Sequence, residues 1–319
     1  MTVNGARSDE YPVNAGVPQG SVLGPLMWVV FLGDGLNMFP EADAFADDVT
    51  LSASCEPKLL KNLIKDFNRR LDLLARWSEQ WQVKFATHKT QFLIIWRTQL
   101  YAVLKFGQSI LINENLIEIL GLNYDHSLSF QLHIRKIASK AAGKITALRR
   151  ITWLVNREER VLLYKAQIRP VLEFSPLTWG GAAATHLGLL DKVQRRAERL
   201  SNGEDAEEQL HTLQHRRDVA GLCVMYKVHE MGVEHLSPLR QAPRPVPRVT
   251  RAAAADTTQR ALKEGRSHTL HHQLTFLPRY TRLWNKFVTS APKEELEPSM
   301  RSLHRFKCAT NEWLLSREQ

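Results

Sequence analysis

Two adjacent carboxylates, Asp47 and Asp48, are the clearest chemical feature of the sequence. Hydrophobic segments at residues 42–45 and 49–53 flank them, a layout typical of a β-hairpin with its acids at the turn. Carboxylates that project from one tight bend can bind Mg²⁺ and leave coordination positions for substrate phosphates. A solvated acidic turn without any ligand has the same local sequence, so the pair alone does not decide between the two interpretations.

A glycine-flanked loop precedes the acidic pair. Pro18 and Gln19 lie between Gly16 and Gly20, and glycines allow the backbone to approach a ligand without a Cβ in the way. Ser21 is suited to cap a helix that runs to about residue 31. The sequence therefore predicts a loop followed by a helix immediately before the acidic hairpin.

The charge distribution favours a polyanionic partner. The chain carries 43 Lys and Arg against 33 Asp and Glu, a net charge of +10. Residues 131–200 hold fourteen basic and five acidic side chains, a net charge of +9, whereas residues 1–50 have a net charge of −6. Nucleic acid is the first candidate partner and an anionic membrane surface the second.

Amphipathic helices would display this positive charge. From residue 130 the apolar positions Ile134, Ile137, Ala141, Ile145 and Leu148 follow a helical period, and the period resumes at residues 161–171 and 187–200. The candidate nucleic-acid-binding residues on the other faces are Arg135, Lys136, Lys140, Lys144, Arg149 and Arg150. A charged outer helix face that only meets solvent is the alternative.

The elements that position the acidic pair are mixed. Residues 59–77 place Leu63, Phe67, Leu71 and Leu74 on one face of an amphipathic helix. Strands are expected at residues 91–96, 103–106, 109–112 and 117–122, with Gly107-Gln108 as a turn. The fold class is therefore α+β, with a mixed first part and a helical, basic second part. Three prolines in residues 242–247 open an expected linker.

Cysteine usage and hydropathy exclude two classes of protein. Cys55, Cys223 and Cys308 are far apart and odd in number, which argues against a disulfide framework. The start of the chain is polar, and the longest apolar run is far shorter than the roughly 20 residues that span a bilayer. We expect no membrane span and no secretory signal, and hence a nuclear or cytoplasmic protein.

Two motifs closely resemble those of the reverse transcriptases of non-LTR retrotransposons. They are the decapeptide Gly16-Val17-Pro18-Gln19-Gly20-Ser21-Val22-Leu23-Gly24-Pro25 and the box Phe45-Ala46-Asp47-Asp48. Further matches follow in order, at Trp77 and Trp81, Lys84-Phe85, Lys89-Thr90, Leu120-Gly121-Leu122, Leu163-Tyr164-Lys165, Arg169-Pro170-Val171-Leu172-Glu173, Trp179-Gly180-Gly181 and Phe276-Leu277-Pro278-Arg279. The second half is similar to the helical region that follows the polymerase in jockey-like elements, so the resemblance covers about residues 4–315.

The resemblance implies an architecture and a set of partners. Residues 1–125 would form part of a right-hand polymerase palm, residues 126–240 a basic, thumb-like helical region, residues 241–270 a linker and residues 271–319 a C-terminal helical segment. The implied activity is RNA-directed DNA synthesis with Mg²⁺, on an RNA template and a DNA primer.

It also implies roles for individual residues. Asp47 would bind both catalytic metal ions and Asp48 would support it, in a two-metal phosphoryl transfer. The segment Pro18, Gln19 and Gly20 would lie near the nascent base pair, and Phe45 would pack beneath the hairpin. Lys89 would meet the leaving pyrophosphate, where a cation stabilises the developing charge; a solvated lysine is the alternative.

One catalytic part of the family has no counterpart in the sequence. Its polymerases use a third carboxylate, from a strand before the loop and helix, and neither Asp9 nor Asp43 lies in such a motif. Two adjacent aspartates are insufficient to hold two Mg²⁺ ions against their mutual repulsion. We therefore expect the isolated chain not to polymerise. The alternatives are a nucleic-acid-binding remnant that uses the basic helices alone and a translated fragment without a role.

Overall fold

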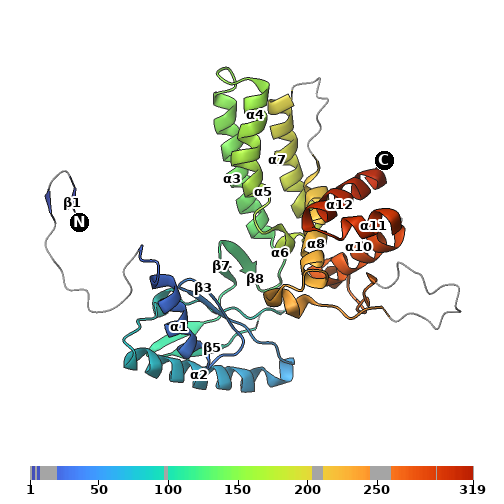
Figure 1. Cartoon of the computed structure of the whole chain (residues 1–319). Coiled ribbons are helices and arrows are strands. Elements are labelled where there is room, and N and C mark those ends of the chain that lie inside the picture. Colours follow the sequence, from blue (N-terminus) through green and yellow to red (C-terminus); the bar gives the residue numbers. More distant parts are fainter. Residues whose placement is uncertain are drawn as a thin grey trace, which may run out of the picture. The chain divides into compact units, whose positions relative to one another are not determined.

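A computed structural model of the chain describes residues 2–3, 6–7, 20–96, 100–202, 211–244, 260–291 and 293–318. The chain divides into two compact units, unit 1 (Met1–Leu128) and unit 2 (Ser129–Gln319). Helices and small, two-stranded antiparallel sheets make up the described residues, which confirms the mixed fold class at this level (Figure 1). Among these residues no helix combines the length and the hydrophobicity needed to cross a lipid bilayer.

Unit 1 pairs each strand with its neighbour in sequence. Its elements are β1 (Thr2–Val3), β2 (Ala6–Arg7), α1 (Gly24–Leu36), β3 (Ala42–Phe45), β4 (Asp48–Leu51), the short 3-10 helix η1 (Pro57–Leu59), α2 (Leu60–Gln80), the 3-10 turn η2 (Thr87–Lys89), β5 (Val103–Phe106), β6 (Ser109–Ile112), β7 (Leu116–Ile119) and β8 (Leu122–Asp125). Two residues separate the strands of β3–β4, β5–β6 and β7–β8, and side chains of the first two of these hairpins pack against the core that α2 supplies.

The predicted amphipathic helix supplies the core of unit 1. Phe67, Leu71, Leu74 and Trp77 of α2 are buried, and they pack against a second set of apolar side chains: Phe39, Leu104, Phe106 and Leu111. The predicted apolar face is thus confirmed at Phe67, Leu71 and Leu74, while Leu63 lies at the margin of this core.

Two strand predictions were wrong. Residues 91–96 form no strand: Phe92 makes a single bridge with Asn113, and the Ile94 N–H donates to the Asn113 side chain at 2.7 Å. The backbone donors of this segment therefore meet a side chain and scattered carbonyls instead of one ladder. Residues 117–122 do not form one strand, because a turn separates β7 from β8. Leu120 and Gly121 both have positive φ there, 48° and 78°.

The hairpin β3–β4 is tied to both helices of unit 1. At its base, Arg70 of α2 forms an ion pair with Glu41 at 2.6 Å. At its tip, the Trp28 indole Nε1 on α1 donates a hydrogen bond to the Ala46 carbonyl at 3.0 Å. Helix α1 is itself held by Trp77, whose Nε1 donates to the Asp34 carboxylate at 2.9 Å. The turn that carries the acidic pair is thus positioned by aromatic side chains on two helices.

Helix α1 begins later than the sequence suggested. The Ser21 hydroxyl accepts a hydrogen bond from the Gly24 N–H at 2.9 Å, so Ser21 does satisfy a donor at the helix start. The helix itself spans Gly24–Leu36, with Pro25 in the first turn, where its missing N–H costs nothing.

Unit 2 is helical. Its elements are α3 (Gln131–Arg150), α4 (Arg157–Leu163), a π-helical turn η3 (Tyr164–Ile168), α5 (Arg169–Leu172), α6 (Pro176–Trp179), α7 (Ala184–Asn202), α8 (Leu213–His229), the 3-10 helix η4 (Glu234–Leu239), α9 (Leu270–Leu274), α10 (Phe276–Ser290), α11 (Lys293–Ser299) and α12 (Leu303–Glu318). Helices α3, α4, α5 and α7 run side by side (Figure 1).

The apolar stripe of α3 lies against α7. All five predicted apolar positions are buried, namely Ile134, Ile137, Ala141, Ile145 and Leu148. Leu190, Val193 and Ala197 of α7 are buried as well. A helix whose one face is covered in this way must turn its remaining positions toward solvent, which is where its lysines and arginines lie.

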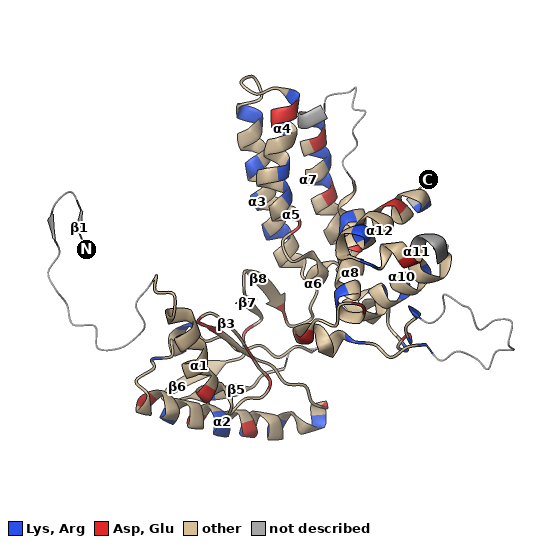
Figure 2. Cartoon of the chain, viewed as in Figure 1, with Lys and Arg blue, Asp and Glu red and all other residues tan. Residues whose placement is uncertain are grey.

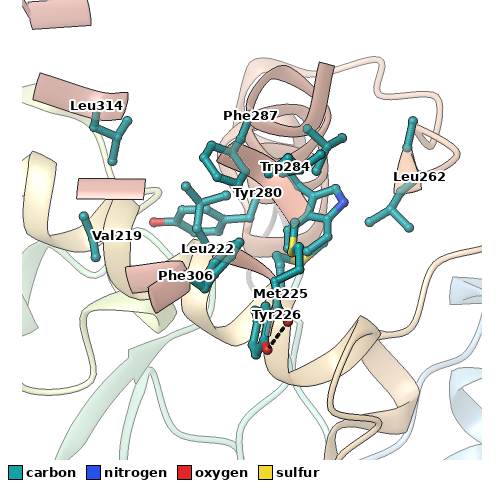
Figure 3. Close-up of a cluster of buried hydrophobic side chains, with 14 residues drawn as sticks. Val219, Leu222, Met225, Tyr226, Leu262, Tyr280, Trp284, Phe287, Phe306 and Leu314 are labelled. Carbon is teal, nitrogen blue, oxygen red and sulfur yellow. Dashed lines mark hydrogen bonds between the residues drawn. The ribbon is translucent and has the colours of Figure 1, made fainter. Parts of the chain in front are cut away.

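A second core of unit 2 joins segments that are far apart in sequence. Leu222, Met225 and Tyr226 of α8 pack with Trp284 of α10 and Phe306 of α12 (Figure 3). The Tyr226 hydroxyl donates to the Met300 carbonyl at 2.8 Å. Residues 245–259 of the expected linker lie outside the described residues, whereas Ala261 and Leu262, within the same expected linker, are buried in this core.

Arginine side chains of α8 connect the two cores. Arg216 forms an ion pair with Glu173 and a hydrogen bond to the Gln194 side chain, while Asp218 pairs with Arg279 at 2.8 Å. Arg217 is buried, lies over the Trp179 ring at 5.8 Å and donates to Gln214. Burial lowers the pKa of Arg217 because desolvation penalises its charged form.

The close packing of the second core can be tested at Gly221 of α8, because a Cβ at this position would overlap the Tyr280 ring. That ring is buried and its hydroxyl donates to the Arg217 carbonyl at 3.1 Å, so it has no room to move. Gly221→Ala is expected to destabilise the chain by about 1–3 kcal/mol in urea unfolding followed by circular dichroism. Gly143→Ala on α3 is the matched control: its Cβ meets open space, and the substitution should stabilise by about 0.5–1 kcal/mol. Equal stability of the two variants would contradict this packing.

Trp28→Phe keeps an aromatic ring on α1 and removes the hydrogen bond to the Ala46 carbonyl. Loss of one such bond costs about 1 kcal/mol, so the amides of β3 and β4 should exchange hydrogen about fivefold faster. Hairpin β5–β6, which takes no hydrogen bond from the Trp28 indole, is the internal control and should keep its protection. Unchanged exchange in β3 and β4 would show that Trp28 does not hold the turn.

Candidate metal centre and nucleic-acid interface

The acidic pair lies at the tip of hairpin β3–β4. Phe45 pairs with Asp48, which leaves Ala46 and Asp47 as the two turn residues. Ala46 has a φ of 55°, an uncommon value for a residue with a Cβ, and its carbonyl accepts the Trp28 hydrogen bond. Asp47 and Asp48 are both exposed. The predicted hairpin with carboxylates at its turn is present, and both carboxylates are open to a ligand from solvent.

The register of the hairpin corrects the expectation for Phe45. Residues paired across an antiparallel ladder share a face, so Phe45 lies on the same face as Asp48, together with Asp43 and Thr50. The opposite face carries Ala42 and Leu51, which pack against the core of unit 1. Phe45 therefore points away from the core and is 67 % exposed. It does not pack beneath the hairpin; it lies beside the acidic pair.

The loop before α1 is described only from Gly20 onward. Pro18 and Gln19, the other two residues expected near the nascent base pair, lie outside the described residues. Gly20 has a φ of 83°, a conformation that strains any residue with a Cβ even though the surrounding space is open. Glycine is therefore favoured at position 20 by the backbone conformation and not by a lack of space for a side chain.

Lys89 ends the turn η2 and is exposed. It belongs to the same compact unit as Asp47 and Asp48. Its expected role at the leaving pyrophosphate stays a prediction.

Oxygen ligands of the kind that Mg²⁺ prefers are available at the tip of the hairpin. Asp47 and Asp48 supply two carboxylates, and Asp43 adds a third carboxylate on the Asp48 face, a diagonal neighbour at about 7–8 Å in such a ladder. Within the described parts of the chain, however, no three His, Cys, Asp or Glu side chains are grouped closely enough to hold a metal ion. The donor set fits part of a Mg²⁺ site and requires further oxygens from water, substrate or another carboxylate.

The cations of α3 lie on its solvent-facing side. At 100° per residue they spread around the helix opposite the buried stripe, and five of them are exposed: Arg135, Lys136, Lys140, Arg149 and Arg150. Lys144 differs, since it is half-buried and its Nζ donates to the Gln167 side chain at 3.2 Å. The predicted basic face is present, with Lys144 engaged within the protein.

Helix α7 adds cations that the candidate set omitted. Lys192, Arg195, Arg196 and Arg199 are exposed, while Val193 and Ala197 between them are buried against neighbouring helices. Figure 2 shows Lys and Arg along both α3 and α7. The helical period of residues 187–200 was itself the signal that assigns these four side chains to solvent. Together α3 and α7 form a basic helical pair suited to contact phosphate groups.

Comparisons with known proteins show which proteins this chain resembles. The reverse transcriptase (RNA-dependent DNA polymerase) family matches residues 1–124. The chain is 25 % identical over 288 residues, 85 % of its length, to the RNA-directed DNA polymerase from mobile element jockey of Drosophila melanogaster. It is 29 % identical over 59 % of its length to the probable RNA-directed DNA polymerase from transposon BS of the same species. No solved structure matches the chain.

A third relative comes from another organism. The chain is 24 % identical over 51 % of its length to the retrovirus-related Pol polyprotein from type-1 retrotransposable element R1 2 of Nasonia vitripennis. The chain spans 31 % of the jockey protein, 22 % of the BS protein and 43 % of the R1 protein. The resemblance noted from the motifs is confirmed: the chain is similar to jockey-like and other non-LTR retrotransposon RNA-directed DNA polymerases, and residues 1–124 match the reverse transcriptase domain.

Proposed function

We propose that this chain is part of an RNA-directed DNA polymerase, with Asp47 and Asp48 in its metal centre and the basic helices of unit 2 on nucleic acid. The observation that carries the proposal is the exposed acidic turn, held by Trp28, within the residues that match the reverse transcriptase family. On this proposal unit 1 corresponds to part of a palm and unit 2 to a thumb-like region. The partners are an RNA template and a DNA primer or another nucleic acid, in the nucleus or the cytoplasm.

Asp47 and Asp48 would hold Mg²⁺ through carboxylate oxygens, and both are exposed, so substrate phosphates can share the same ion. When bound, the metal supplies Lewis-acid stabilisation of the attacking and leaving oxygens of a phosphoryl transfer. Phe45, exposed beside Asp48, offers an apolar ring to a sugar or base near the metal centre. Lys89 would neutralise charge on the leaving pyrophosphate.

The 319-residue polypeptide by itself is not expected to extend a primer. Two divalent cations that share two carboxylates keep a net charge of about +2 at short separation, and their repulsion falls only as further anionic ligands are added. Asp43 is too far along the ladder to join Asp47 in one site. A complete metal centre therefore requires at least one further carboxylate, outside the described acidic turn.

Primer extension tests this conclusion. Purified chain is incubated with an RNA template, an annealed DNA primer, deoxynucleotides and Mg²⁺ or Mn²⁺, beside an Asp47→Ala variant. We expect neither protein to extend the primer, while both retain the duplex in a salt-sensitive manner. Extension by the wild-type chain that the Asp47→Ala variant loses would overturn the expected inactivity and would directly support the catalytic role of Asp47.

Nucleic-acid binding by the basic helices is tested by charge reversal. The double variant Arg149→Glu and Arg150→Glu removes two exposed cations of α3 and should weaken binding to an RNA–DNA duplex by about tenfold or more. The slope of log affinity against log salt should fall by roughly two, independent of sequence. Lys61→Glu with Lys65→Glu on α2 makes the same change in net charge in unit 1 and serves as the matched control. Equal loss in both double variants would indicate a general charge effect and contradict a binding face on α3.

A non-catalytic nucleic-acid-binding remnant is the second candidate. The observation that favours it is the basic pair of helices, which is complete within the described residues, whereas the metal centre is not. Binding that depends on Arg149 and Arg150 but is indifferent to Asp47 would make this the better description.

A further inference from the structure

The loop between α3 and α4 exposes a tryptophan. Helix α3 ends at Arg150 and α4 begins at Arg157, and Trp153 between them is 80 % exposed. The loop forms the free end of this helical hairpin (Figure 1). Most large aromatic side chains of unit 2 are buried instead, as Trp179 and Trp284 are. An indole left in water forfeits the stabilisation that its burial would give.

The exposed ring is held in place. Its Nε1 donates a hydrogen bond to the Arg150 carbonyl at 3.1 Å, at the end of α3 where carbonyls lack helical partners. The loop backbone is fixed as well: the Leu154 N–H donates to the Ile151 carbonyl at 2.9 Å, and the Thr152 hydroxyl donates to the Arg149 carbonyl at 2.9 Å. The polar edge of the indole is thus occupied within the protein, while its faces remain open to solvent.

Cations flank the ring on both sides in sequence. Arg149 and Arg150 are exposed immediately before the loop, and Arg157 is exposed immediately after it. The nearby acids are Glu158 and Glu159; Glu159 is engaged in the capping box of α4, where its carboxylate accepts the Asn156 N–H at 2.8 Å. Residues 149–160 contain four arginines and these two glutamates, so the surroundings of the ring are net positive.

We propose that Trp153 is a stacking platform for an unpaired base of single-stranded nucleic acid, with Arg149 and Arg150 on the adjoining phosphates. This inference rests on the proposed nucleic-acid binding by unit 2. It identifies the part of the nucleic acid that the loop between α3 and α4 would bind. A fixed aromatic face beside cations is the arrangement that binds single strands without reading sequence, since every base has a π-face. Bases within a duplex already stack on one another, so the platform selects unpaired segments such as a template strand beyond its primer.

The chemistry of two adjacent loop residues distinguishes this ligand from a membrane. A tip that inserts into an anionic bilayer gains from its apolar area as well as from its cations, and Leu154, 61 % exposed beside Trp153, would then contribute to binding as the ring does. A stacked base requires a π-face, which Leu154 lacks. The two ligands therefore predict different results at adjacent residues of one loop.

The experiment compares full-length variants in binding to fluorescent oligoadenylate, as RNA and as DNA, and to an abasic strand of equal length. Trp153→Ala should weaken binding to both oligoadenylates by about tenfold and leave the abasic strand unaffected, because that strand keeps its phosphates and lacks bases. Trp153→Phe should retain most of the affinity, and Leu154→Ala all of it. Both side chains are exposed, so unchanged urea midpoints confirm that the variants fold.

The possible failures are distinguishable. Wild-type affinity of Trp153→Ala, while the double variant Arg149→Glu and Arg150→Glu loses binding, would overturn the stacking platform and leave the proposed function intact. Absence of any salt-sensitive binding by the wild-type chain would overturn both. Loss of binding to phosphatidylserine vesicles in Trp153→Ala and Leu154→Ala alike, with oligoadenylate binding unchanged, would identify the loop as a membrane contact. If Trp153→Ala weakened binding to only one of the RNA and DNA oligoadenylates, the expectation that the platform binds both kinds of strand would be wrong.

Discussion

The position of the acidic turn depends on the packing of Trp77 against α1. A Cβ at Gly35 would lie 3.0 Å from the Trp77 ring, so glycine is what allows the helix to approach α2 this closely. The same indole donates to Asp34, one residue earlier on α1. Trp28, on that helix, then holds the carbonyl of Ala46. Two residues with no chemistry of their own, Trp77 and Gly35, thereby determine where Asp47 and Asp48 lie.

The candidate sites of the two units have opposite charge. The acidic turn of unit 1 repels a phosphate backbone until a cation neutralises it, and residues 1–50 as a whole have a net charge of −6. On the proposed function, helices α3 and α7 would attract the same backbone without any metal, since their cations are exposed and their apolar faces are buried against each other. The proposed association with nucleic acid and the proposed coordination of metal would thus be separable properties of this chain, even though one reaction would require both.

Helical periodicity correctly predicted which face of the long helices is buried. All five apolar residues that the spacing selected on α3 are buried: Ile134, Ile137, Ala141, Ile145 and Leu148. A period of 3.6 residues places them on one face of the helix, so the buried face could be read from the sequence. Hairpins were harder. The segments at residues 42–45 and 49–53 predicted the turn, yet they did not show which face of the ladder meets the core, and the family resemblance placed Phe45 on the wrong face. Residues 91–96 have the composition of a strand, but no neighbouring ladder accepts them, a long-range fact that local sequence does not contain.

The π-helical turn η3 limits how the length of the segment from α4 to α5 can change in evolution. Pro170 lacks an N–H, and its ring would strike the carbonyl four residues earlier in a regular helix; the wider turn at Tyr164–Ile168 accommodates it. That turn contains one residue more than an α-helical turn would, and Tyr164, Ile168 and Leu172 are buried with this phase. Deletion of a single residue there would rotate α5 by about 100° relative to α4. Length variation should therefore be excluded from this segment and concentrated in the loops that join the helices.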